Sequence, residues 1–247
     1  MNQWVAKWLR IYLKSYISLI LYHRNVYPAV SFELTTYQSF NLPQFIPVSR
    51  HEGLISYIEE LVTDLLSKLI HTYRVSVCIL DSQDESRVLE RYVLDFSEFK
   101  HTENQGVVTE TEVFDEFRTS LNSLITRLEK LPSVRNGAVS FEIAIGTVQL
   151  ELGHAIETGW DLRSQEQLDA FERDVNWVKC DEDEGLGELP AQLQSQQPTP
   201  RIKMMALVGC DAGPLVIHSF IEMVMFTNQG NSGTVYSQYD EDYSFQF

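Results

Sequence analysis

The stretch "RVSVCILDSQDESRVLERYVLDF", residues 74–96, decides the fold class of this 247-residue chain. Apolar and polar residues alternate on both sides of a polar turn, "DSQDES". Alternation with a period of two is typical of β-strands, because successive side chains of a strand point to opposite faces of a sheet. We therefore expect a β-hairpin with strands over 74–80 and 87–96.

Three stretches around this hairpin have apolar residues at helical spacing. They cover residues 3–24, 52–71 and 112–131, and an apolar stripe with a period near 3.6 predicts an amphipathic helix. The first stretch is apolar on most sides, which favours a helix in the core over one that lies on a membrane. We expect Thr111 to cap the third helix, and Pro132 follows the end of that helix.

Further strands are predicted on both sides of the third helix. Residues 138–152 alternate as a strand does, and residues 202–209 and 213–226 form two strand-like runs with a Gly/Pro turn between them. Residues 29–50 contain two prolines and predict irregular structure or short strands. Strands that are grouped together, with helices elsewhere, predict an α+β fold in which helices back a sheet.

Charge divides the chain near residue 150. Residues 1–150 have a net charge of −4, whereas residues 151–247 carry 5 basic and 17 acidic residues, a net charge of −12. Nucleic-acid binding in a groove needs a clustered basic face, so we expect no direct contact with nucleic acid. Residues 181–200 are acidic and then rich in Gln and Pro, a composition that predicts a flexible loop.

No catalytic motif is present in the sequence. It lacks a phosphate-binding loop, a dinucleotide-binding glycine motif and a nucleophile elbow, and its six histidines are not at metal-ligand spacing. Cys78, Cys180 and Cys210 are too widely spaced for a disulfide framework or a metal pair, which predicts a reducing compartment. The acidic residues beside Cys180 would raise the pKa of its thiol, so we favour inert thiols at Cys180 and Cys210. Charges interrupt the apolar N-terminus, so neither a signal peptide nor a membrane span is expected.

One alternative with chemistry stays open. Asp181, Asp183 and Glu184 could serve a metal-dependent hydrolase, and Gly185 follows them as in a calcium loop. The ligand periodicity differs from that of a calcium loop, and the terminal glutamate does not fit either. A solvated acidic loop is therefore the favoured interpretation, and we expect neither a metal nor another cofactor.

Several segments carry a family resemblance, and they keep their order along nearly the whole chain. They are "LILYHRNVYP" (19–28), "HEGLISYIEELV" (51–62), "VCILD" and "RYVLDF" (77–81 and 91–96), "NWVKCDEDE" (176–184) and "RIKMMALVGCDAGPLVIHSF" (201–220). These segments, together with the order of the predicted helices and strands, resemble those of the HORMA-domain family. Within the family they are most similar to the fungal accessory subunits of DNA polymerase zeta.

This resemblance implies a fold and a way of binding. It implies a single HORMA domain over residues 1–247, with three helices packed on a mainly antiparallel sheet in a core of about 1–150. A C-terminal safety belt of about 151–247 would wrap across the sheet and trap a partner peptide beneath it. The peptide would add to the sheet as a strand, so that main-chain hydrogen bonds provide affinity. Release would be slow because the belt must open first.

The resemblance also assigns roles to individual positions. Tyr57, Trp177 and Ile202 fall at positions that contact the partner peptide. Val216 and His218 fall at belt positions that contact the peptide or a second partner, although animal relatives have larger polar or aromatic residues there. The third helix is the family's surface for self-association; the candidate residues on it are Arg118, Asn122, where animal relatives have an arginine, and Arg127.

The function implied by the resemblance is that of a non-catalytic adaptor in the nucleus. It would trap a proline-containing peptide of the catalytic subunit of DNA polymerase zeta. It would also bridge to the translesion deoxycytidyl transferase scaffold and form a dimer of HORMA domains. No membrane is involved in this hypothesis. The alternative within the family is a spindle-checkpoint or meiotic peptide-binding protein.

Overall fold

A computed structural model describes most of the first 147 residues and four shorter ranges beyond them. The described residues are 3–35, 46–69, 72–99, 109–147, 177–178, 201–213, 215–225 and 235–236. The chain divides into two compact units. The first contains Met1–Gly146 and Pro200–Phe247, and the second contains Thr147–Thr199.

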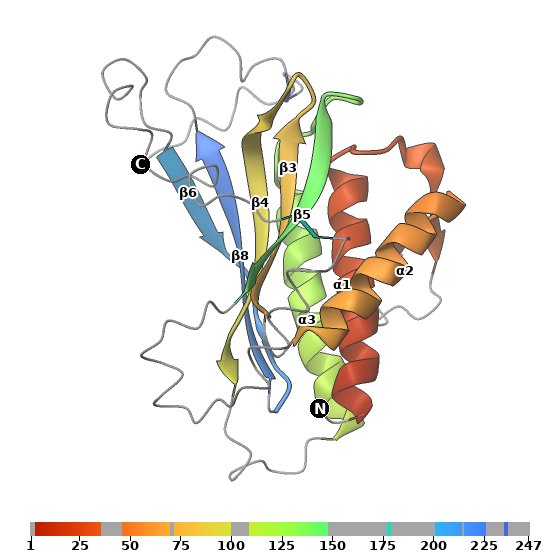
Figure 1. The fold of residues 1–247 in the computed structure, drawn as a ribbon, viewed down its shortest axis with the longest axis vertical. Coiled ribbons are helices and arrows are strands. Elements are labelled where there is room, and N and C mark those ends of the chain that lie inside the picture. The colour runs from red at the N-terminus through yellow and green to blue at the C-terminus, as the bar shows by residue number, and fades with distance from the viewer. Residues whose placement is uncertain are drawn as a thin grey trace. The chain divides into compact units, whose positions relative to one another are not determined.

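The first unit is built on a sheet in which the C-terminal strands β8 and β6 continue a sheet formed by β5, β3 and β4 (Figure 1). The strand order is β5-β3-β4-β8-β6, and a short β7 also pairs with β8. Every pair whose register is known is antiparallel, as expected. The strands are β3 (Thr72–Asp81), β4 (Asp84–Phe99), β5 (Val139–Thr147), β6 (Arg201–Ala206), β7 (Cys210–Asp211) and β8 (Leu215–Met225).

The hairpin expected from residues 74–96 is confirmed as β3 and β4. Val77 pairs with Tyr92 near the middle of the hairpin, and both strands are longer than the alternation predicted. The turn is shorter than the polar stretch, because the carboxylate of Asp81 accepts a hydrogen bond from the backbone N–H of Gln83 at 3.0 Å. A local side-chain acceptor of this kind closes a tight turn and lets the flanking polar residues join the strands.

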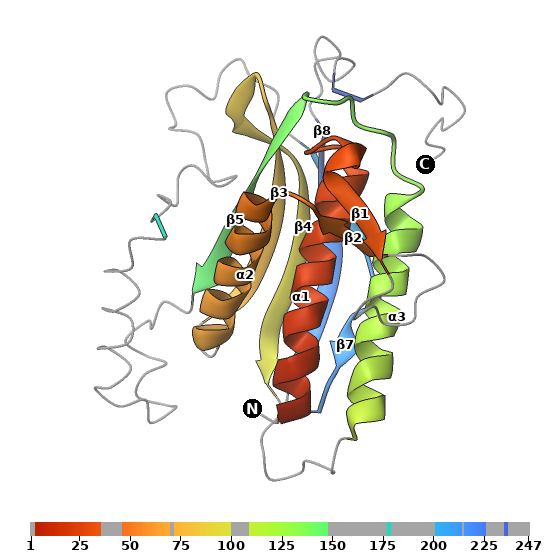
Figure 2. The ribbon, with the colours of Figure 1, turned by 90° about the vertical axis from the view of Figure 1, so that its right-hand side faces the viewer.

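Three α-helices are present in the described residues, as the sequence predicted: α1 (Gln3–His23), α2 (Glu52–Ser67) and α3 (Glu110–Leu128). They lie on one face of the sheet, with α1 between α2 and α3 (Figure 2). Tyr12 and Tyr16 of α1 are fully buried, so this helix is in the core. A 3₁₀ turn (Ala29–Ser31) leads into a small separate sheet of β1 (Phe32–Thr35) and β2 (Ile46–Ser49).

The start of α3 differs from the prediction of a Thr111 cap. Thr109 is the N-cap: its hydroxyl accepts the N–H of Glu112 at 3.3 Å, and the carboxylate of Glu112 accepts the N–H of Thr109 at 2.8 Å. This reciprocal pair is a capping box, which needs a Glu or Gln three residues after the cap. Thr111 has Phe114 at that position, so the prediction was wrong.

The C-terminal strands also differ in detail from the prediction. The expected strand 202–209 ends at Ala206, and the supposed turn contains the additional strand β7. Gly209 explains the interruption. A Cβ atom at Gly209 would lie 2.2 Å from the carbonyl oxygen of Ile217, so only glycine lets the chain pass this close to β8.

A buried ion pair links four parts of the first unit. The guanidinium of Arg24, which is 1% exposed, donates to the carboxylate of Glu90, which is fully buried, at 3.3 Å. Arg24 also donates to the carbonyl of Pro132 at 3.0 Å. The hydroxyls of Tyr92 and Tyr236 donate to the same carboxylate at 2.6 and 3.0 Å. The charge of Glu90 is thus compensated by a cation and two hydroxyls, as a buried charge requires.

We predict that Arg24→Met lowers the free energy of unfolding by about 3–5 kcal/mol, because it leaves the Glu90 carboxylate buried without its cation. Urea unfolding followed by circular dichroism measures this change. The matched control is Arg50→Met. Arg50 is 60% exposed and 3.8 Å from Glu33, and exposed pairs contribute at most about 1 kcal/mol. Equal effects of the two substitutions would contradict the importance of the buried pair.

Candidate partner-binding site

The strand β5 forms one edge of the sheet. It pairs with β3 on its inner side, and in the part of the chain that the structure describes no strand pairs with its outer side. A free edge presents backbone N–H and C=O groups that another strand can use. Glu142 and Ala144 of β5 are exposed. Among the described residues, the outer edge of β5 therefore has no strand partner.

Aromatic side chains lie beside this edge. Phe141 of β5 contacts the rings of Tyr27 and Tyr57 edge to face, with centroid distances of 6.2 and 6.0 Å. Tyr57 extends from α2 and is 42% exposed. Burial of its other part, together with the nearby Tyr27, raises the pKa of Tyr57. Tyr57 therefore packs on β5 with one side of its ring and leaves the rest exposed.

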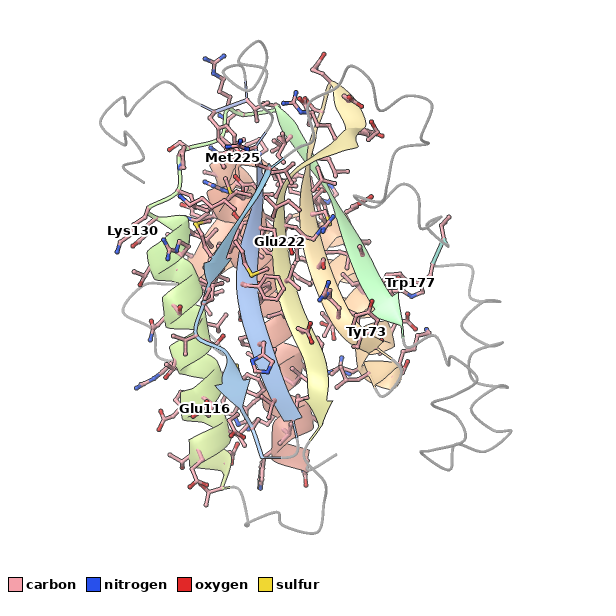
Figure 3. The ribbon with its side chains drawn as sticks, turned by 90° about the vertical axis from the view of Figure 1, so that its left-hand side faces the viewer. Tyr73, Glu116, Lys130, Trp177, Glu222 and Met225 are labelled. Carbon is pink, nitrogen blue, oxygen red and sulfur yellow. The ribbon has the colours of Figure 1, made fainter. Side chains whose placement is uncertain are left out.

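The far end of β5 has a second aromatic neighbour. A Cβ atom at Gly146 would lie 2.6 Å from the ring of Tyr73, so glycine allows this ring to lie against the strand backbone. Tyr73 is 37% exposed and lies beside the end of β5 in Figure 3. Sequence reasoning missed Tyr73. Only the strand order, which no local pattern records, brings it next to β5.

Ile202 lies at the opposite edge of the sheet. It belongs to β6 and is 45% exposed, whereas Tyr57 contacts β5. Four strand spacings separate these two edges, a distance of roughly 19 Å at about 4.8 Å per spacing. The structure therefore does not bring Ile202 together with Tyr57, and a peptide that adds to β5 as a strand does not reach Ile202.

Val216 and His218 share the face of the sheet that points away from the helices, which Figure 3 views directly. Along β8, Leu215 and Ile217 are buried, whereas Val216 is half-buried and His218 exposed. On this face Arg91 of β4 also forms an ion pair with Glu222 at 2.9 Å, and Ile202 pairs with Val224. Ile202, Val216 and His218 thus belong to one surface made of β6 and β8.

Trp177 belongs to the second unit. It is half-buried, and Val178 beside it is 92% exposed. The role of Trp177 at the peptide channel stays a prediction. The acidic residues Asp181, Asp183 and Glu184, the thiol of Cys180 and the predicted flexible loop 181–200 lie outside the described residues.

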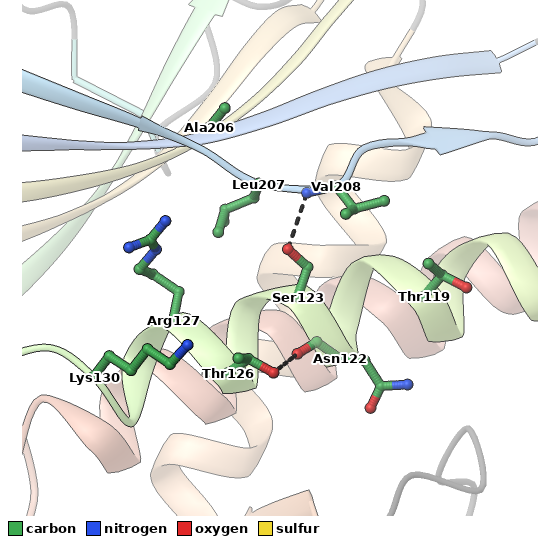
Figure 4. A pocket seen from close by; sticks show the side chains of 9 residues that line it. All are labelled: Thr119, Asn122, Ser123, Thr126, Arg127, Lys130, Ala206, Leu207 and Val208. Carbon is green, nitrogen blue, oxygen red and sulfur yellow. Dashed lines mark hydrogen bonds between the residues drawn. The ribbon is translucent and has the colours of Figure 1, made fainter.

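A pocket of about 360 Å³ lies between α3 and the chain that leaves β6 (Figure 4). Asn122 and Arg127 line it, as does Lys130, which sequence reasoning missed although it follows Arg127 by one helical turn. Arg118 does not line the pocket. It pairs with Asp115 at 3.7 Å and lies over the ring of Phe114 at 5.9 Å. The other lining residues are Thr119, Ser123, Thr126, Ala206, Leu207 and Val208.

The same helix fastens the C-terminal strands. The hydroxyl of Ser123 accepts a hydrogen bond from the N–H of Val208 at 3.0 Å (Figure 4). The carboxylate of Glu116 accepts one from the N–H of Asp211, also at 3.0 Å. Between these two contacts, Cys210 is 3% exposed. The strands β6 and β7 are therefore attached to α3 as well as to β8.

Metal and membrane roles receive no support from the described residues. In these ranges, no three His, Cys, Asp or Glu side chains are grouped closely enough to bind a metal ion. None of the helices found there combines the length and the apolar character that a membrane span requires. The described cysteines, Cys78 and Cys210, are buried free thiols, which agrees with the expectation of inert thiols.

Comparison with known proteins identifies relatives over nearly the full length. A family model described as the HORMA domain matches residues 5–144. A protein of Saccharomyces cerevisiae named DNA polymerase zeta processivity subunit is 54% identical over 242 residues, which is 98% of this chain and 96% of that protein.

Solved structures agree with this fold. A chain of the mitotic checkpoint complex superimposes with a TM-score of 0.61 at 15% identity, covering 88% of this chain and 97% of that one. Caenorhabditis elegans HTP-1 bound to the HIM-3 closure motif superimposes with a TM-score of 0.54 at 9% identity, covering 90% and 91%. At these identities the likeness shows the fold alone.

The buried thiol of Cys210 provides a test of how firmly β7 is attached. Burial raises the pKa of Cys210 to about 12, so at pH 8 the thiolate that reacts with iodoacetamide is rare. We predict that alkylation of Cys210, measured by peptide mass spectrometry, is about 1,000-fold slower in the folded chain than in urea. The rate should rise with pH as the thiol ionises.

Gly209→Ala should accelerate this alkylation at least about tenfold, because the new methyl group displaces β7 from β8. Gly137→Ala is the matched control. Gly137 has a positive φ, of 72°, so alanine strains the backbone there, but no atom lies within 4 Å of its Cβ position. The control destabilises the fold without touching β7. Equal rates in the two variants would show that Gly209 does not hold β7 in place.

Proposed function

Because the chain belongs to the HORMA-domain family, we propose that it is the adaptor subunit of a translesion DNA polymerase zeta. The observation that carries this proposal is the similarity of the whole chain to the yeast processivity subunit. HORMA domains are modules for protein interaction, so the chain is not an enzyme, and the metal-dependent hydrolase with Asp181, Asp183 and Glu184 is set aside. The nucleus, where such a polymerase acts, is its proposed location.

The proposed ligand is an extended, proline-containing peptide of the polymerase's catalytic subunit. It pairs with the free edge of β5 through main-chain hydrogen bonds, while Tyr57 contacts its side chains. Trp177 and the belt that begins near residue 151 close over it. The free edge and the exposed part of Tyr57 support this arrangement, and so does the binding of a closure motif by a HORMA protein of the same fold.

A second partner, the translesion deoxycytidyl transferase scaffold, is proposed to bind the surface of β6 and β8. Ile202, Val216 and His218 share this surface, and Met204, two residues from Ile202 on β6, is 63% exposed. Large apolar side chains that are exposed side by side are typical of binding surfaces. Because this surface and β5 lie at opposite edges of the sheet, both partners can bind at the same time. This is what an adaptor requires.

Self-association is proposed to use the pocket beside α3. Asn122 and Arg127 line it, whereas Arg118 lies outside it.

The net charge of −12 over residues 151–247 leaves contact with DNA to other subunits, because this half of the chain repels a polyanion.

The alternative within the family is a spindle-checkpoint or meiotic protein. The structures of such proteins share the fold with this chain at 9–15% identity, which is far below the 54% of the polymerase subunit. A pull-down in which checkpoint, meiotic and polymerase peptides compete for the chain separates these functions. Preference for a checkpoint or meiotic peptide would overturn the proposal.

We predict that Tyr57→Ala weakens binding of the polymerase peptide about 10–100-fold, since an aromatic residue that contacts a peptide is often a hot spot. Fluorescence anisotropy with a labelled proline-containing peptide of the catalytic subunit measures the affinity. Ile55→Ala is the matched control. Ile55 is also on α2 and 44% exposed, but it lines a groove with α1 and β2. A folded Tyr57→Ala variant with unchanged affinity would contradict the assignment of Tyr57.

Trp177→Ala tests the belt in the same assay. If Trp177 lines the channel, the variant remains folded and releases the peptide faster, because the belt closes less tightly. Unchanged affinity and release rate would remove Trp177 from the site and leave the β5 edge as the main determinant of binding.

A further inference from the structure

The pocket beside α3 has an electrostatic character that is unusual for this chain. Arg127 and Lys130 lie side by side at one end of it (Figure 4), and neither has an ion-pair partner among the described residues. The whole chain has 35 acidic and 19 basic residues, and most of its described cations are paired. Two neighbouring cations without partners, next to a cavity, favour a ligand with several carboxylates.

The outer side of β6 leads to the same pocket, which Ala206 lines. The N–H of Leu207 donates to the carbonyl of Ser219 at 2.9 Å, so alternate residues of this strand are bonded to β8. In an antiparallel pair the residues between them point their N–H and C=O groups the other way. Ile202, Met204 and Ala206 therefore present these groups to the outer side of β6, with which no strand pairs among the described residues. The next such N–H, that of Val208, is already bonded to Ser123.

A segment with matching charge starts close to this pocket. Residues 237–247, "SQYDEDYSFQF", contain Asp240, Glu241 and Asp242 and no basic residue; they lie outside the described part of the chain. The residue before them is fixed, because Tyr236 forms a β-bridge with Val134 and its hydroxyl donates to Glu90.

The reach of this segment is sufficient. Val134 is only four residues beyond Lys130 in the sequence, so the two are at most about 14 Å apart, at 3.3–3.6 Å per residue. From Tyr236, which is held against Val134, the four residues to Asp240 span up to about 14 Å as well. Asp242 is six residues from Tyr236 and spans up to about 21 Å. The carboxylates can therefore reach Lys130, and Arg127 one helical turn before it, without any change in the described elements.

We propose that residues 240–242 dock in cis on this pocket, extended along the free edge of β6, with their carboxylates at Arg127 and Lys130. The tether gives the segment an effective concentration of about 1 mM, which an acidic segment of another molecule lacks. The docked segment covers Asn122 and Arg127, so it competes with any partner that uses this face of α3. The pocket is thus an interaction surface that the chain's own segment blocks. A test of this proposal needs no polymerase subunit.

The test uses the full chain with the three carboxylates neutralised together by Asp240→Asn, Glu241→Gln and Asp242→Asn. The probe is a fluorescein-labelled peptide of residues 237–247, and its binding is followed by anisotropy. We expect the neutralised chain to bind the peptide about tenfold more tightly than the original chain. This factor follows if the peptide has a dissociation constant of about 0.1 mM and the tethered segment competes at an effective concentration of about 1 mM.

Two further variants assign the site in the neutralised chain. Arg127→Ala combined with Lys130→Ala should abolish peptide binding, whereas Arg118→Ala, which changes a cation of the same helix outside the pocket, should preserve it. Binding should also weaken as salt rises from 50 to 500 mM, since exposed ion pairs are screened.

Several outcomes would overturn the proposal. Equal binding by the original and neutralised chains would show that the pocket is not occupied in cis. Absence of binding to both would show that the segment does not fit there. Loss of binding in Arg118→Ala would place the site elsewhere on α3. If light scattering shows that the original chain is a dimer and the neutralised chain a monomer, the segment docks on a second copy instead.

Discussion

The pairing of β8 with β4 is the constraint on which the rest of the structure depends. It places a strand from the end of the chain inside the sheet, next to the central hairpin. With that position taken, β5 and β6 become the two edges of the sheet. The two proposed partner surfaces are therefore far apart, and a single domain can hold two partners. Disruption of this pairing would remove the surface of β6 and β8 and the pocket beside α3 together.

The buried ion pair of Arg24 and Glu90 also stabilises the position of the C-terminal residues in the sheet. Glu90 belongs to β4, and its carboxylate accepts from Tyr236 as well as from Arg24. A carboxylate with no solvent exposure is costly to leave without donors. Residues near the end of the chain therefore complete the environment of a charge in the core. The C-terminal part is thus coupled to the core by electrostatics, and not by strand pairing alone.

Local patterns predicted the elements, and long-range packing determined the sites. The periods of two and 3.6 were sufficient for α1, α2, α3 and the β3–β4 hairpin, because each pattern depends on neighbours within one element. They could not show that Tyr57 and Ile202 lie at opposite edges, that Tyr73 lies beside β5, or that Lys130 completes a pocket. Those facts depend on the strand order, which puts β8 between β4 and β6. Thr109 was missed although Glu112 supplies the capping-box signal.

The helix α3 connects the proposed activities. Its buried side packs on α1, where the hydroxyls of Tyr12 and Ser120 lie 2.9 Å apart. Ser123 and Glu116 hold the backbone of the C-terminal strands, and Arg127 and Lys130 line the pocket at its end. A partner that moves this helix must therefore strain the attachment of β6 and β7. Binding free energies are reciprocal between coupled sites. The attachment of β6 and β7 to α3 therefore favours a ligand that binds in the pocket without moving the helix. An acidic segment that docks without moving α3 satisfies this condition.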